Sequence, residues 1–84
     1  MDGIEAVGMV AGLLTTIAFV PQVLKTWRTR SARDFSLPML VLFTFGIALW
    51  LAYGLLLHQL PIILPNVVTL LLSAYILAVK LKEV

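Results

Sequence analysis

Two stretches without a charged side chain constrain this chain more than any other feature. Residues 6–24 and 35–79 contain no Asp, Glu, Lys or Arg, so the runs are 19 and 45 residues long. A helix needs about 20 residues to cross the ~30 Å hydrocarbon core of a bilayer. The first run therefore fits one crossing. The second would be about 68 Å long as one helix, which is twice the core, so it must turn back. The sequence thus predicts three crossings.

The turn inside the longer run is predicted at its most polar point, His58-Gln59, just before Pro61. Proline is favoured in the first turn of a helix, where its missing N–H has no helical partner in any case. Ser36 is the expected N-cap of the second helix, with Pro38 in its first turn. We expect one domain over residues 1–84, with helices at about 4–26, 37–57 and 61–81. The predicted fold class is an all-α membrane protein, a bundle of three transmembrane helices.

Composition agrees with a membrane protein and argues against several other classes. Hydrophobic residues make up 62% of the chain and charged residues 12%, whereas soluble domains average about 45–50% and about 25%. There is no Cys, one His, and no pair of acidic residues at catalytic spacing. We therefore expect no enzyme activity, no metal and no cofactor. Four of the six basic residues lie in the segment 25–33, which suits a topology signal better than a nucleic-acid site.

Charge also predicts the orientation. Lys and Arg occur only in the first loop and its flanks, 25–33, and near the end of the third helix, at 80 and 82. Three crossings place these two segments on one side, which the positive-inside rule assigns to the cytoplasm. The N-terminus and the turn at His58 are then expected outside.

Polar and aromatic residues within the crossings suggest a path for a solute. Three helices cannot surround such a path, so transport would need a second copy, and a homodimer is the simplest assembly. Trp50 lies near the middle of the second helix, and Asn66 lies in the third. An indole face stacks on the C–H faces of a sugar, and a carboxamide bonds to hydroxyl groups. In the alternative, Trp50 fills space and Asn66 bonds between helices. The residues alone favour this alternative over a sugar site about twofold.

Two features of the first helix have alternative interpretations. Pro21 removes a backbone hydrogen bond and clashes with the carbonyl of Ile17, so Pro21-Gln22 is predicted to form a kink or hinge, unless the helix simply ends there. Gly8 and Gly12 have the spacing that allows helix backbones to approach closely. For this pair we favour packing within the chain, against the second or third helix.

Three motifs together resemble those of a known family. The segment 19–27, Phe-Val-Pro-Gln-Val-Leu-Lys-Thr-Trp, with 33–36, Arg-Asp-Phe-Ser, resembles the PQ-loop signature. Residues 50–54, Trp-Leu-Ala-Tyr-Gly, and 65–70, Pro-Asn-Val-Val-Thr-Leu, resemble the remaining motifs of SemiSWEET proteins, bacterial half-size relatives of SWEET sugar transporters. The resemblance covers nearly the whole chain, in order.

This resemblance implies a parallel symmetric homodimer of three-helix bundles, packed in the order 1-3-2, with sugar bound at the dimer axis. It implies that Trp50 and Asn66 bind the substrate, that Pro21 (with Gln22) is the hinge, that Phe43 is the cytoplasmic-side constriction and that Tyr53 is the outer gate. One departure concerns the segment 57–59, Leu-His-Gln, where similar proteins often carry Arg-x-Asp. An ionic contact at the outer gate is therefore not expected here.

The function expected from the resemblance is facilitative transport of a mono- or disaccharide across the bacterial inner (plasma) membrane, by alternating access. Two alternatives stay open: a proton-coupled PQ-loop exporter of amino acids, and a non-transporting subunit of a membrane assembly. We expect a uniporter, because the charge-free runs contain no acidic or basic side chain except His58, at the outer turn. The expected partners are a sugar, the lipid bilayer and a second copy, with no nucleic acid.

Overall fold

The computed structural model describes residues 2–83 and contains three α-helices: α1 (Gly3–Thr29), α2 (Leu37–Leu57) and α3 (Leu60–Glu83). Each is long and apolar enough to cross a membrane. The bounds of α2 match the predicted range. α1 continues three residues beyond its predicted end, so Trp27 lies within the helix, and α3 begins one residue early, which places Pro61 in its first turn.

Local sequence signals explain where the helices begin and end. The Asp2 carboxylate accepts a hydrogen bond from the Glu5 amide at 2.7 Å and caps α1. Ser36 caps α2 as predicted, with its Oγ accepting from the Met39 amide at 3.2 Å. α1 and α2 both end at a non-glycine residue in the left-handed region, Arg30 and His58, each with a φ of 55°. This conformation stops the helix and redirects the chain.

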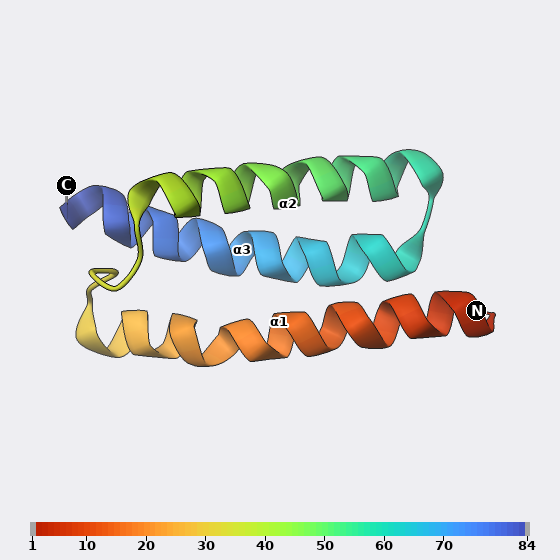
Figure 1. The fold of residues 1–84 in the computed structure, drawn as a ribbon, viewed down its shortest axis with the longest axis horizontal. Coiled ribbons are helices and arrows are strands. Elements are labelled where there is room, and N and C mark those ends of the chain that lie inside the picture. Colours follow the sequence, from red (N-terminus) through yellow and green to blue (C-terminus); the bar gives the residue numbers. More distant parts are fainter. Residues whose placement is uncertain (1, 84) are drawn as a thin grey trace.

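The three helices lie side by side, with α3 between α1 and α2 (Figure 1). α3 packs along both neighbours, whereas the backbones of α1 and α2 do not approach each other within residues 2–83. This confirms the packing order 1-3-2. One end of the bundle carries the α1–α2 loop, residues 30–36, and the last turn of α3; we call it the loop end (Figure 1). The other, the turn end, carries the N-terminus of α1 and the α2–α3 turn.

Glycine and proline allow α1 and α3 to pack closely in the turn-end half. A Cβ built on Gly12 would lie 2.5 Å from the Pro65 Cγ, so this contact exists only because position 12 has no side chain. A Cβ on Gly8 would lie 3.5 Å from the Pro61 Cβ, an ordinary contact. The Gly8–Gly12 pair therefore packs within the chain against α3, as the sequence analysis favoured.

Buried hydroxyl groups join the helices near the middle of the bundle. The Thr16 hydroxyl lies 2.7 Å from the Thr69 hydroxyl and 3.3 Å from the Pro65 carbonyl, which connects α1 to α3. On the other side of α3, the Thr44 hydroxyl donates to the Ser73 hydroxyl at 3.2 Å, which connects α2 to α3. In a lipid environment such bonds replace water as the partner of polar groups. α3 thus holds both neighbours through its own hydroxyls.

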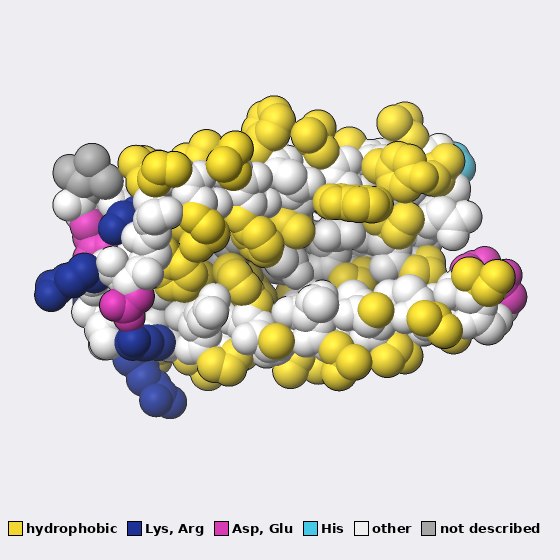
Figure 2. Space-filling model, in the orientation of Figure 1, with side chains coloured by type: hydrophobic (Ala, Val, Ile, Leu, Met, Phe, Trp, Pro, Cys, Tyr) yellow, Lys and Arg dark blue, Asp and Glu magenta, His cyan; other side chains and the backbone are white. Residues whose placement is uncertain are grey.

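Most apolar side chains point outward, and a small apolar core lies towards the loop end. Leu40 and Ile76 are fully buried, and Ala32 of the loop inserts between the helices beside them. By contrast, many leucines are largely exposed, such as Leu56 at 81%. Hydrophobic side chains cover most of the length of the bundle, and the basic ones gather at the loop end (Figure 2). An exposed apolar belt between polar ends is the surface expected of a chain surrounded by lipid.

Candidate functional site

A groove of about 500 Å³ runs between the three helices in the turn-end half of the bundle. All three helices contribute to its walls, and Trp50 of α2 and Asn66 of α3 both line it. This volume lies within the range of roughly 300–1,000 Å³ that is common for small-molecule sites. The tertiary structure therefore brings together the two side chains that the sequence analysis singled out, although they are 16 positions apart in the chain.

Asn66 owes its position to the prolines of α3. Pro65 immediately precedes it and packs into the gap left by Gly12, which fixes this turn of the helix against α1. The Asn66 Nδ2 donates to the Ile62 carbonyl at 2.6 Å, and this bond orients the carboxamide. Among the described residues, its Oδ1 accepts no hydrogen bond. One N–H and one carbonyl oxygen of the amide therefore remain to bond a solute in the groove.

Trp50 presents a large aromatic surface that the single chain leaves uncovered. Its side chain is 56% exposed although it lies near the middle of α2, and it lines the groove. Tyr53, one turn further towards the turn end, meets the indole edge-to-face with ring centroids 5.6 Å apart. An edge-to-face pair restricts the tilt of both rings. The indole is therefore held by a neighbour on its own helix while about half of its surface stays exposed.

Phe43 lines the groove and makes a contact that sequence reasoning did not anticipate. Its ring stacks on Phe19 of α1, with centroids 5.5 Å apart and an interplanar angle of 18°. This stacked pair links α1 to α2, whose backbones are otherwise apart, and both rings line the groove. Along α2, Phe43 lies seven residues to the loop-end side of Trp50, and Tyr53 lies three residues to the turn-end side. Phe43 and Tyr53 thus flank Trp50 along α2.

The predicted hinge residues lie outside the groove. α1 continues through Pro21, and its side chain does not line the groove. Because proline has no N–H, the carbonyl of Ile17 lacks its usual helical partner at this turn. Gln22 lines a smaller pocket of about 210 Å³ beside the α1–α2 loop. Its backbone carbonyl accepts a hydrogen bond from the buried Thr26 hydroxyl at 2.9 Å, one turn after the proline.

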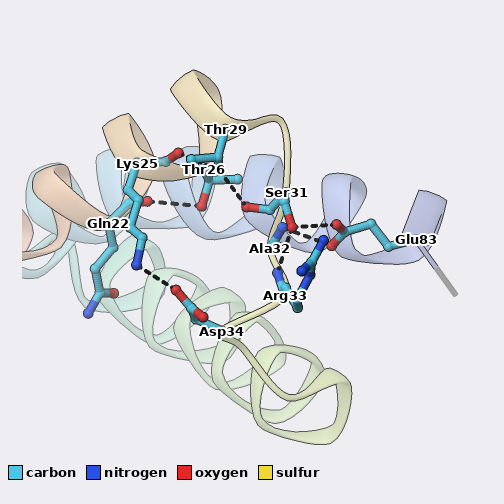
Figure 3. Close-up of polar contacts among 9 residues, drawn as sticks. All are labelled: Gln22, Lys25, Thr26, Thr29, Ser31, Ala32, Arg33, Asp34 and Glu83. Atoms are coloured by element: carbon cyan, nitrogen blue, oxygen red, sulfur yellow. Dashed lines mark hydrogen bonds and ion pairs between the residues drawn. The ribbon is translucent and has the colours of Figure 1, made fainter.

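Polar contacts organise the loop end (Figure 3). The Lys25 ammonium pairs with the Asp34 carboxylate at 2.6 Å, and both side chains are well exposed. The hydrogen bond and the charge of Lys25 hold the pKa of Asp34 below its usual value, which favours the ionised carboxylate. Glu83, at the end of α3, accepts hydrogen bonds from the Ser31 hydroxyl at 2.6 Å and from the Ala32 amide at 2.8 Å.

Asn66, Thr69 and Ser73 follow one another along α3 at steps of three and four residues, a spacing that places them on one face of a helix, but their roles differ. Asn66 and Thr69 both line the groove, but Thr69 also bonds to α1, whereas Ser73 lies outside the groove and bonds to α2. Thr15 and Phe19 also line the groove, and the sequence analysis gave neither of them a role. Their spacing of four residues, continued by Ala11 in the other direction, is a helical signal that could have revealed this face of α1.

The fold and the groove together define a three-helix membrane protein of the PQ-loop type. The family model described as "PQ loop repeat" matches residues 3–63, well over half of the chain. The chain belongs to the PQ-loop family and, within it, to the SemiSWEET proteins.

Individual relatives support this assignment over nearly the full length. The chain is 48% identical to "Sugar transporter SemiSWEET" from Bradyrhizobium diazoefficiens, over 94% of this chain and 92% of that protein. It is 49% identical to the protein of the same name from Leptospira biflexa, over 92% of this chain and 91% of that protein. Among solved structures, a SemiSWEET in the inward-open conformation matches with a TM-score of 0.88 and 38% identity, covering 98% of this chain and 95% of the other.

Proposed function

We propose that this protein is a sugar transporter that binds its substrate between Trp50 and Asn66. The observation that carries the proposal is the position of these two side chains in one groove of about 500 Å³. The names of the relatives from Bradyrhizobium and Leptospira point to the same substrate class. The indole face stacks on the C–H face of a pyranose ring, while the amide of Asn66 donates to one hydroxyl and accepts from another.

The functional unit in this proposal is a parallel symmetric homodimer. In one chain the groove is open on a side, and the Trp50 indole and the Tyr53 ring are about half exposed. A second copy related by a two-fold axis would cover these rings and supply a second Trp50 and Asn66 across a shared cavity. In lipid, such an association is driven by van der Waals packing and interhelical hydrogen bonds rather than by removal of apolar surface from water.

Transport in this proposal alternates access between the two ends of the bundle. Tyr53 closes the turn end and Phe43 the loop end, with bending of α1 at Pro21-Gln22 permitting the exchange. In this proposal the loop end faces the cytoplasm of a bacterial inner membrane and the N-terminus lies outside, which the basic residues of the loop end support. Transport is uniport, because within the described helices no acidic or basic side chain lies along the groove and His58 lies at the turn end.

The test is uptake of radiolabelled sugars by purified protein in liposomes, with protein-free liposomes as background. A panel of mono- and disaccharides covers the substrate class. Trp50→Ala and Asn66→Ala should each reduce uptake at least tenfold, because a lost stacking face or a lost pair of hydrogen bonds is felt twice in a symmetric dimer. Trp27→Ala is the matched control: this exposed tryptophan lies near the loop end of α1, outside the groove.

The outcome decides between the three candidate functions. Sugar uptake that is lost in the two groove variants and kept in Trp27→Ala supports the proposal. Uptake of amino acids driven by a pH gradient, without sugar uptake, would indicate an exporter instead. Well-folded protein that moves neither class of solute would indicate an assembly subunit. Crosslinking in native membranes that yields only monomer, at efficient labelling, would contradict the homodimer.

A further inference from the structure

The α1–α2 loop is fixed to α3 at a single acidic residue. Each oxygen of the Glu83 carboxylate accepts one hydrogen bond, Oε2 from the Ser31 hydroxyl at 2.6 Å and Oε1 from the Ala32 amide at 2.8 Å (Figure 3). The Ser31 oxygen in turn accepts from the Arg33 amide at 3.1 Å. Three consecutive loop residues are therefore ordered around one side chain of α3. Hydrogen bonds to an ionised carboxylate are shorter and stronger than those between neutral groups.

This contact holds the part of the loop that is inserted most deeply. Ala32 is only 1% exposed and packs with Leu40 of α2 and Ile76 of α3, so its methyl group contributes to the apolar core at the loop end. Its amide points to Glu83. The carboxylate and the core therefore fix the same residue from two sides, and the loop cannot leave α3 without losing both contacts.

The two polar connections of the loop end differ in what they join. The Lys25–Asp34 pair joins α1 to its own following loop, so these two segments can move together without breaking it. The Glu83 contacts join the loop to α3. If the segment after Pro21 swings away from α3, it carries the first loop residues with it. This movement must break the Glu83 hydrogen bonds, whereas the Lys25–Asp34 pair can stay intact.

We propose that Glu83 is a positioning residue for transport, which holds the loop-end segment of α1 against α3 and so opposes opening of the groove at the loop end. The inference rests on the proposed function, because it concerns the equilibrium between a groove open at the loop end and a groove open at the turn end. Hydrogen bonds that exist in one arrangement and are absent from the other shift the population towards the first. Glu83 touches no residue that lines the groove in the described contacts, so it acts through the loop.

The absence of native cysteine makes a direct test possible. Ile47 lines the groove between Phe43 and Trp50, so an Ile47→Cys variant reports access to the groove by a membrane-impermeant maleimide. Labelling is measured in inside-out and right-side-out membrane vesicles. An Arg33→Cys variant, with the reporter in the exposed loop, identifies which vesicles present the loop end to the reagent.

Glu83→Ala in the Ile47→Cys background should raise the labelling rate from the loop end about threefold or more and lower it from the turn end, because two hydrogen bonds are lost. Glu83→Gln keeps one acceptor oxygen and should give an intermediate rate. Asp34→Asn is the matched control, because it removes a carboxylate from the loop without removing a bond to α3, and should leave both rates unchanged.

A purely structural role would not produce this asymmetry. If Glu83→Ala raises labelling from both ends equally, or changes neither, the positioning role is refuted. The readout needs no sugar, so it stands apart from the proposed function: a protein that does not transport sugar can still show or lack the shift. Hydrogen exchange gives a second measurement, in which the Ala32 amide should exchange faster in Glu83→Ala than in Asp34→Asn. Equal exchange in the two variants would also overturn the inference.

Discussion

Replacement of Gly12 by alanine should destabilise the protein, whereas the same change at Gly8 should not. The two glycines lie one helical turn apart on α1 and face α3. A Cβ at position 12 meets the rigid ring of Pro65 at 2.5 Å and 2.7 Å, while a Cβ at position 8 meets Pro61 at 3.5 Å. The chemical change is identical, so the difference in the free energy of unfolding between the two variants measures how closely α1 and α3 approach at Pro65.

The magnitude follows from the displacement that the new methyl group requires. To reach the 3.5 Å seen at Gly8, α1 and α3 must separate by about 1 Å at Pro65. Overpacking of this size costs about 1–3 kcal/mol. The same movement stretches the bonds from Thr16 to Pro65 and Thr69, which are worth about 0.6 kcal/mol each in membrane proteins. Alanine gains about 1 kcal/mol over glycine in helix propensity, which offsets the weakened bonds. The net loss expected for Gly12→Ala is therefore about 1–3 kcal/mol.

The assay is unfolding in mixed micelles with increasing denaturing detergent, followed by far-ultraviolet circular dichroism at fixed protein concentration. Gly8→Ala serves as the control and should match the parent or exceed it by up to about 1 kcal/mol, since it gains helix propensity without a clash. Sugar uptake should fall for Gly12→Ala as well, because Pro65 precedes Asn66 in the groove wall. If the two variants unfold within about 0.5 kcal/mol of each other, the close contact inferred here does not limit stability.

Three further predictions concern the hinge, the driving force and the buried hydroxyls. Pro21→Ala should slow sugar exchange several-fold while raising thermal stability, because the restored N–H completes the helix; unchanged flux in the folded variant would remove the hinge role. An imposed pH gradient should not produce accumulation of sugar in liposomes that start with equal sugar on both sides, and accumulation would indicate proton coupling. Thr16→Val and Thr69→Val should each destabilise by about 1 kcal/mol, and the double variant should lose less than the two single losses combined, because the hydroxyls lie 2.7 Å apart. Strictly additive losses would show that the pair does not interact.

The sequence by itself determined the membrane class, the number of helices and the position of one cap. These features depend on interactions that are local or that involve lipid: a run without charge needs a hydrophobic surrounding, and a serine before Leu37 caps the helix that follows. The segregation of basic residues to one end is equally visible in the chain, because an odd number of crossings places 25–33 and 80–82 together. The motif resemblance added the packing order 1-3-2, which the helix contacts then confirmed.

The tertiary structure alone decided the partners of the polar residues on α3: Asn66 and Thr69 line the groove, and Thr69 and Ser73 bond to neighbouring helices. Spacing placed Asn66, Thr69 and Ser73 on one face of α3, but a helix in the centre of a bundle has two neighbours, so residues on one face diverge to different partners. The stacking of Phe19 on Phe43 and the contact of Glu83 with Ser31 join residues 24 and 52 positions apart. Such pairings depend on the relative rotation and depth of whole helices, which are set by contacts such as Gly12 against Pro65. The pairings themselves leave no periodic signal in a single sequence.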